Sequence, residues 1–487
     1  MHTSNRLSDE KMKEDVSLKE DVEDGTVEDV NQHNVFVETE DGPDFRGVSV
    51  WGAAVLIAKS QFGLGVIGLP GTFQVLGMFP GLLTLVVLCA LSTWTGVVVG
   101  KFRLSHPQVH SIGDATYLMF GKFGCELMGV AFWLFYTLCY GASLLTVSIG
   151  FNAMTDHAIC TMGWVGMGAA VAMILGLSLR TMKALSWCGY VAVTTIFLGV
   201  WIVVIACLAQ KVPAAAPAGE PVDKNVLAVP KGSSYFAISS AVATQLLSLC
   251  GTASFFTIHA EMRDQKKYVK SVLLGQGFVV FNYIAITVII YAKVGQYVAS
   301  PALGSAGPLF KNIGYGVAMP ALFFSCFFQA HVAAKYALVR ILRGTKHLQS
   351  NSLIHWGTWV SMMIVVIAVG FVIAGGIPFF DDLLGLIGAF LGTSFTLILP
   401  ACMALYEMAK ITTPEEHAGR PLVWLKESQK SWNKGKLNLF IAVVAWFTIF
   451  SGLYILVSGA YGSVRSIAEN FASGDVGSAF SCADNSG

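Results

Sequence analysis

Apolar runs long enough to cross a lipid bilayer recur along most of this chain. A helix needs roughly 20 consecutive, mostly apolar residues to span the hydrocarbon core. Continuous runs of this length indicate helices, because a transmembrane barrel is built from shorter segments in which apolar and polar residues alternate. We therefore predict an all-α integral membrane protein with eleven spans, at about residues 50–77, 79–102, 125–152, 161–179, 187–209, 235–259, 271–293, 309–340, 355–375, 383–406 and 437–458.

The composition supports this fold class and excludes several functions. Of the 487 residues, 54% are hydrophobic and only 13% are charged, whereas a soluble domain carries about 25% charged residues. This balance excludes a normal cytosolic enzyme, a disordered protein and a nucleic-acid binder. The sequence also lacks a metal-ligand cluster, a nucleotide-binding loop and the spacing of a catalytic triad. We therefore expect neither an enzyme nor a metal site or cofactor.

A near-neutral net charge of +1 hides two different segments of the chain. Residues 1–46 hold 14 of the 30 acids but only five of the 31 bases. A segment of low hydrophobicity and high net charge cannot bury enough apolar surface to offset the entropy of ordering. We predict that residues 1–46 form a disordered acidic tail, residues 47–460 the transmembrane domain, and residues 461–487 a second, flexible tail.

The basic residues of the loops predict the orientation of the spans. One alternating set of loops and span ends holds 18 Lys and Arg residues, and the other holds six. Cytoplasmic loops are the ones enriched in Lys and Arg. We therefore expect the N-terminus to be cytoplasmic and, after eleven spans, the C-terminus to be extracellular or lumenal.

Ten cysteines do not form a disulfide framework in a chain of this size. Eight of them lie in the apolar spans, where a thiol behaves as a small buried hydrophobe. Only Cys160 and Cys482 fall on the predicted outer face. These two cysteines either pair with each other or remain free thiols.

Two spans carry signals for an interrupted helix, which exposes backbone donors and acceptors in the middle of the membrane. In span one, three glycines within six residues precede a proline in the segment Gly63–Pro70, and span six holds a weaker break around Gly251. The alternative explanation for such glycines is close packing between helices. The backbone of the two breaks gives these candidate substrate-binding residues: Gly63, Leu64, Gly65, Val66, Gly68, Ser248, Cys250, Gly251 and Thr252.

At these residues the chain resembles a known family. The segment Phe255–Lys270 is similar to the signature at the end of span six in the amino acid/auxin permeases, and Gly63–Pro70 matches their span one. The segments Gly77–Gly96 and His106–Ala115 resemble the fungal neutral amino acid permeases within the amino acid-polyamine-organocation superfamily. The resemblance covers residues 47–460 and implies a LeuT-like fold, in which spans 1–5 and 6–10 are inverted repeats with broken helices 1 and 6. It also implies secondary transport of amino acids coupled to protons.

A binding mode for an amino acid follows from the two breaks. Backbone N–H groups at the start of the second half of span one can meet the carboxylate, and carbonyls freed at Ser248–Gly251 can meet the ammonium group. The predicted spans hold no acid in mid-membrane, so a cationic substrate would stay unpaired and a neutral one is expected. Tyr136 and Tyr140, one turn apart, either line this site or only pack against lipid and other helices.

Three ionisable residues inside the spans are candidates for proton coupling. Lys59 lies one turn before the break in span one, and His331 and Lys335 share a face of span eight. A lysine held out of water gives up its proton more readily, so Lys335 with His331 can exchange protons. The alternative is a lysine whose stem crosses apolar surface to reach the cytoplasmic edge. We expect a proton, and not sodium, as the coupling ion.

The leading hypothesis is a proton symporter that imports neutral aliphatic or aromatic amino acids across the plasma membrane. A vacuolar or vesicular transporter of the same fold, an amino acid sensor that does not transport, and a channel are the alternatives. Paired broken helices favour alternating access over an open pore. The expected partners are a small neutral amino acid and the lipid bilayer, with no nucleic acid.

Overall fold

The computed structural model describes residues 47–485 except 110, 179–181, 218–220, 230–231, 349, 378, 411–418 and 474–478. Within this part of the chain, ten helices are long and apolar enough to cross a membrane. The helix pair α2 and α3, bent by 42° at a short break, supplies an eleventh span. The predicted all-α fold with eleven spans is confirmed, whereas the acidic tail at residues 1–46 lies outside the described residues.

The helices follow the predicted order. Serine side chains cap the first turns of α2, α8 and α12, which satisfies backbone N–H groups that have no partner within the helix. The bounds are α2 Val50–Gln61, α3 Leu64–Leu76, α4 Met78–Ser105, α5 Ile112–Thr155, α6 Thr161–Ser178, α7 Met182–Ala209, α8 Tyr235–Ser248, α9 Thr252–Ala260, α10 Tyr268–Val294, α11 Pro308–Leu342, α12 Leu353–Gly376, α13 Phe380–Ile387, α14 Leu399–Lys410, α15 Pro421–Ser431 and α16 Lys436–Ser473.

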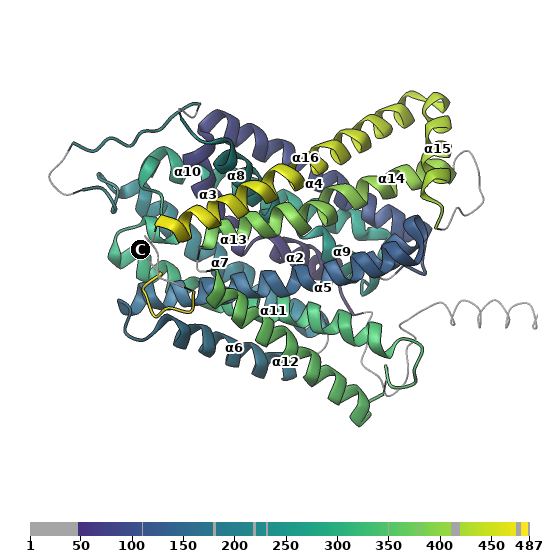
Figure 1. Cartoon of the computed structure of the whole chain (residues 1–487), viewed down its shortest axis with the longest axis horizontal. Helices are drawn as coiled ribbons and strands as arrows, with labels where there is room; N and C mark the ends of the chain where they lie inside the picture. The colour runs from purple at the N-terminus through teal and green to yellow at the C-terminus, as the bar shows by residue number, and fades with distance from the viewer. Residues whose placement is uncertain are drawn as a thin grey trace, which may run out of the picture.

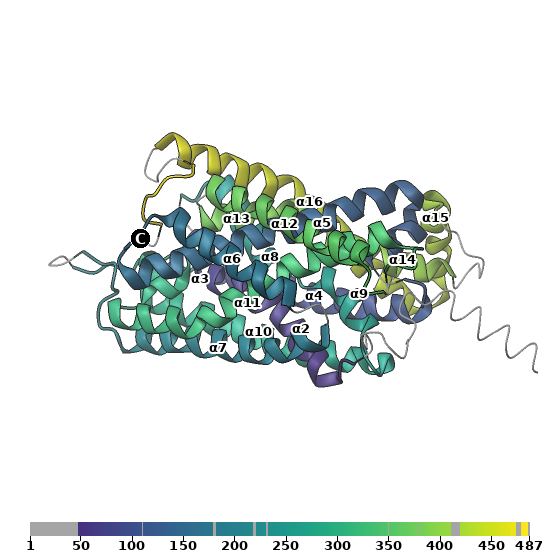
Figure 2. The same cartoon turned by 90° about the horizontal axis from the view of Figure 1, so that it is seen from below.

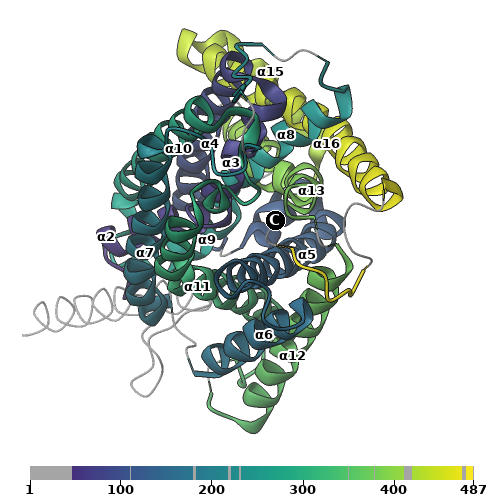
Figure 3. The same cartoon turned by 90° about the vertical axis from the view of Figure 1, so that its left-hand side faces the viewer.

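Most of the helices run along a common direction, while α15 lies across one end of the bundle (Figures 1 and 2). Two groups can be distinguished when the bundle is seen from its end (Figure 3). In one group α5, α6, α11 and α12 pack against each other, and in the other α2, α4, α9 and α10 do so. The two broken spans pack on each other, α3 against α8, and each also touches α5 of the first group, through α3 and α9 respectively.

The C-terminal segment departs from the expected flexible tail. Helix α16 continues to Ser473, well past residue 461. Farther on, Cys482 forms a disulfide with Cys160, and the Phe480 amide donates to the Gly375 carbonyl at 2.7 Å. The structure therefore resolves the cysteine alternatives in favour of a pair. The disulfide also places the α5–α6 connection and the C-terminal segment at the same end of the bundle. An even number of spans lies between these two segments along the chain, so both are expected on the same side of the membrane.

Candidate functional site

The break in span one is shorter than predicted. Helix α2 ends at Gln61 and α3 begins at Leu64, so only Phe62 and Gly63 leave the helical path. The helix then continues through Pro70, whose missing N–H falls in the second turn of α3. No side chain among the described residues caps α3, so its first N–H groups face the break without such a partner.

Gly65 and Gly68 belong to α3, and the predicted unwinding at these two positions is wrong. A Cβ at Gly65 would lie 2.7 Å from the Cα of Ser248, and one at Gly68 would lie 2.9 Å from a methyl group of Leu384. Both glycines therefore permit close packing, which was the alternative explanation. Val66, between them, is buried in the apolar core.

The break in span six is mild, and several of its carbonyl groups already accept hydrogen bonds. Helix α8 ends at Ser248 and α9 begins at Thr252. The Leu249 carbonyl accepts from the Gly251 amide at 2.9 Å, and the Gly251 carbonyl accepts from the Ser254 amide at 3.0 Å. Two of the carbonyls expected to receive a substrate ammonium group, those of Leu249 and Gly251, thus already accept a hydrogen bond within the protein.

Tyr283 of α10 joins the two breaks. Its hydroxyl oxygen lies 2.8 Å from the Gln61 carbonyl and 2.8 Å from the Ser248 carbonyl, and its single proton is shared between these acceptors. The side chain is fully buried. Nothing in the sequence indicates this contact, because the residues around Tyr283 show only an ordinary apolar pattern.

A cavity of about 40 Å³ lies beside the breaks, between α2, α3, α5, α8, α11 and α13. Six of the predicted residues line it, namely Lys59, Gly63, Leu64, Gly65, Tyr136 and Cys250. The other lining residues were not predicted: Ser60, Gln61, Phe135, Cys139, Ala142, Leu247, Ser325, Phe328, Gln329, Leu384 and Ile387. Most of them are apolar residues of regular helices, so only the four polar ones, as polar residues within apolar spans, carried a signal that could have found them.

The remaining predicted residues lie outside this lining. Tyr140 is fully buried, and its ring packs so closely on Gly370 that a Cβ there would collide with it. Gly251 packs in the same way on Ser60, and Thr252 begins α9 inside the core. Tyr140 therefore packs against other helices, which was the alternative interpretation, and of the two tyrosines only Tyr136 lines the cavity.

Lys59 places an amino group at the start of α3. Its Nζ donates to the Ser325 hydroxyl of α11 at 2.7 Å and lies 5.5 Å from the centre of the Phe324 ring. A Cβ at Gly63 would lie 2.9 Å from this nitrogen. Lys59 and the first N–H groups of α3 thus make one side of the cavity electropositive.

His331 and Lys335 do not reach the central cavity. The buried His331 ring packs edge-on against Trp359, with 5.2 Å between the ring centres. Lys335 forms an ion pair with Glu261 at 2.8 Å, which joins α11 to the end of α9. The three coupling candidates are therefore spread over three environments.

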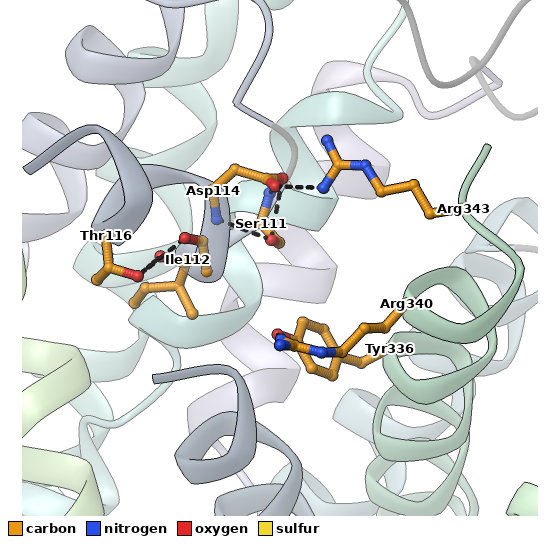
Figure 4. A network of polar contacts seen from close by, with 8 residues as sticks. Ser111, Ile112, Asp114, Thr116, Tyr336, Arg340 and Arg343 are labelled. Carbon is orange, nitrogen blue, oxygen red and sulfur yellow. Dashed lines mark hydrogen bonds and ion pairs between the residues drawn. The ribbon is translucent and has the colours of Figure 1, made fainter. Parts of the chain in front are cut away.

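A larger hollow of about 350 Å³ lies toward the end of the bundle that carries the basic loops. We call it the vestibule, and it is lined by α5 between Ile112 and Phe132, by α9 and by the last turns of α11. Arg343 donates to Asp114 at 2.7 Å, and Arg340 donates to the Tyr336 hydroxyl at 3.0 Å (Figure 4). The Asp114 carboxylate raises the pKa of Arg343.

Aromatic rings separate the vestibule from the central cavity. Phe132 lines the vestibule and Tyr136 the cavity, and their ring centres are 4.8 Å apart. Phe395 closes this layer from the side, 6.1 Å from the Phe132 ring. Among the described residues, no three His, Cys, Asp or Glu side chains are placed to hold a metal ion.

Comparison with known proteins identifies the family of this chain. Residues 46–463 match the family described as "Transmembrane amino acid transporter protein". The chain belongs to this family. A relative named "Transmembrane transporter" from Gibberella moniliformis is 33% identical, with 97% of this chain and 95% of the relative covered. The "N amino acid transport system protein" of Neurospora crassa is 28% identical, with 88% and 87% covered.

Solved structures share the fold of this chain. The crystal structure of MhsT in complex with L-phenylalanine superimposes with a TM-score of 0.58, covering 84% of this chain and 98% of that one at 12% identity. This likeness concerns the fold. The predicted LeuT-like architecture, with its five-plus-five inverted repeat and breaks in spans one and six, is confirmed.

Proposed function

We propose that the protein imports neutral amino acids by proton symport, with alternating access to the central cavity. The observation that carries this proposal is the cavity beside the span-one break, where a lysine amino group lies at the start of a half-helix. Membership of the amino acid transporter family supports the class of substrate.

The electropositive side of the cavity suits the carboxylate of an amino acid. The first N–H groups of α3 carry the positive end of the helix dipole and have no side-chain cap in the described structure. Lys59, adjacent to Gly63, adds a full charge when it is protonated. The carboxylate would thus receive hydrogen bonds from the backbone and attraction from one side chain.

The remaining wall of the cavity suits a neutral side chain. It is formed mainly by apolar residues, among them Phe135, Leu247, Phe328, Leu384 and Ile387. Within the described lining there is no Asp or Glu to balance a cationic side chain. Since an unpaired charge inside a membrane is costly, Lys and Arg should be rejected.

Lys59 is the best placed of the three coupling candidates. When protonated it attracts the substrate carboxylate, and when it loses the proton that attraction ends, so binding of proton and substrate are linked. His331 is enclosed by aromatic rings and Lys335 is paired with Glu261, both away from the cavity. The proton would be taken up with the substrate from outside and released with it through the vestibule.

Uptake into proteoliposomes tests this function. Labelled L-alanine, L-leucine, L-phenylalanine and L-lysine are offered with and without an inward proton gradient, and we expect gradient-driven, saturable uptake of the first three only. Lys59→Met should abolish accumulation driven by the gradient, while Lys293→Met, on an exposed position of α10, should not. Sodium-driven uptake at equal pH would overturn proton coupling, binding without flux would indicate a sensor, and flux without saturation a channel.

The location of the protein is part of the same proposal. The basic loops at the vestibule end favour that end as the cytoplasmic one, and we place the protein in the plasma membrane. The alternative location is a vacuolar or vesicular membrane. Fluorescence microscopy of the tagged protein in its own host would distinguish the two.

A further inference from the structure

We infer that the side-chain amides of Gln61 and Gln329, beside the span-six break, bind the ammonium group of the substrate. This inference rests on the proposed function and specifies how its substrate is recognised. A zwitterionic amino acid brings an ammonium group with three donors into the cavity, and each buried donor needs an acceptor. The question is which acceptors the described structure leaves available.

Several main-chain carbonyls beside the cavity already accept a hydrogen bond. Tyr283 donates to the carbonyls of Gln61 and Ser248, and backbone amides occupy those of Leu249 and Gly251. A substrate ammonium group would have to share these oxygens with the donors that they already bind.

Two side-chain amides present acceptors without a partner. Gln61, the last residue of α2, is only 3% exposed and lines the cavity, and neither atom of its amide has a partner within the described structure. Gln329 of α11 also lines the cavity, and its Oε1 is buried without a partner there. A buried amide that stays unpaired costs stability, and since these two amides also line the cavity, a ligand there could satisfy them.

Charge decides which end of the substrate meets the amides. Lys59 and the start of α3 repel an ammonium group and attract the carboxylate, which orients the substrate with its amine away from Gly63. Neutral amide oxygens can accept strong, charge-assisted hydrogen bonds from that amine. Because Gln61 and Gln329 lie on helices of different groups, a bound ammonium would connect α2 with α11.

The test compares amino acids with analogues that lack only the amine. Affinities of the purified full-length protein are measured by titration calorimetry for L-alanine and propionate, L-leucine and 4-methylpentanoate, and L-phenylalanine and 3-phenylpropionate. Gln61→Leu and Gln329→Leu keep the size of the side chain and remove its acceptor. We expect each variant to weaken binding of the amino acid at least tenfold and to change binding of the analogue less than threefold.

A matched control is available in α10. Gln276 is 1% exposed and has an unpartnered Oε1 in the described structure, but it does not line the cavity. Gln276→Leu should keep the wild-type ratio of the two affinities. Should Gln61→Leu fail to fold, Gln61→Glu retains an acceptor and adds a negative charge, so it should increase the preference for the amino acid.

The outcomes separate the inference from the function. If the wild type prefers amino acids and the Gln61 and Gln329 variants keep that preference, the amide assignment is overturned while the transporter stands. If the Gln61 and Gln329 variants lose the preference for amino acids over the analogues, but neither they nor the wild type transport amino acids, the amide assignment stands and the transport function is overturned. If the wild type binds none of the three amino acids, both are overturned.

Discussion

Single atoms determine how closely the two broken spans approach each other. At Gly65 the absence of a side chain lets α3 lie directly on the backbone of Ser248 and on the Tyr283 hydroxyl, each 2.7 Å from the position of a Cβ. The same hydroxyl fixes the carbonyls of both breaks. The residues that shape the cavity therefore also hold its walls together.

Gly65→Ala should destabilise the protein, because neither the Ser248 backbone nor the buried Tyr283 can move aside freely. We expect a loss of about 1–3 kcal/mol, the usual cost of overpacking a core, visible as a lower melting temperature in detergent. Gly277→Ala is the control, since nothing lies within 4 Å of a Cβ at that exposed position. Equal melting temperatures for the two variants would contradict the packing explanation.

Between elements, one ion pair links the two helix groups at the vestibule. Glu261, at the end of α9, is 1% exposed, and Lys335 of α11 is 12% exposed. A pair that is this deeply buried does not by itself prove stabilisation, because both charges lose their hydration. Removing only one partner is different, since it leaves the other charge buried and uncompensated.

We predict that Glu261→Gln lowers the free energy of unfolding by roughly 3 kcal/mol, the low end for a broken buried pair because Lys335 keeps some contact with solvent. Thermal unfolding in detergent measures the change. The double variant Lys335→Met/Glu261→Leu should recover most of the loss, because no lone charge remains. Glu469→Gln, which breaks the exposed pair with Arg465 on α16, should leave the melting temperature unchanged. A double variant as unstable as Glu261→Gln would show that the charges themselves stabilise the fold.

At the scale of the whole molecule, the C-terminal segment is tied back to the bundle. The Cys160–Cys482 disulfide spans 322 residues, and Asn485 donates to Ser148 within α5 at 3.1 Å. The chain thereby closes across the end opposite the vestibule. A covalent link of this length restricts the unfolded chain more than the folded one.

Mass spectrometry of the non-reduced protein should detect a peptide that contains both Cys160 and Cys482. Cys482→Ser should lower the melting temperature, in line with a contribution of about 2–4 kcal/mol for a disulfide, and leave the affinity for amino acids unchanged. Cys402→Ser, at a buried free thiol, controls for loss of a thiol as such. Free thiols at both positions in the wild type would contradict the structure.

The sequence predicted the framework of the site better than its chemistry. The breaks were found at Gly63 and near Gly251 because glycine weakens a helix locally, and Lys59 was found because a charge inside an apolar run is conspicuous. Tyr140, Gly68 and Gly251 lie outside the cavity lining, which the sequence could not show, since a glycine or tyrosine that permits packing has the same local pattern as one that lines a cavity. The break in span one is also shorter than predicted, because α3 stays helical through Pro70, which lies inside the helix and removes one backbone N–H donor without ending it.

By itself, then, the sequence determined the number of spans, their order and the places where two of them break, because bilayer thickness and backbone conformation act on neighbouring residues. Only the tertiary structure decided which polar groups remain available to a substrate. Tyr283 lies 222 residues from Gln61 along the chain, yet it occupies the carbonyl of that residue. The amides of Gln61 and Gln329 are left facing the cavity, since hydrogen-bond satisfaction depends on every helix that packs around the site.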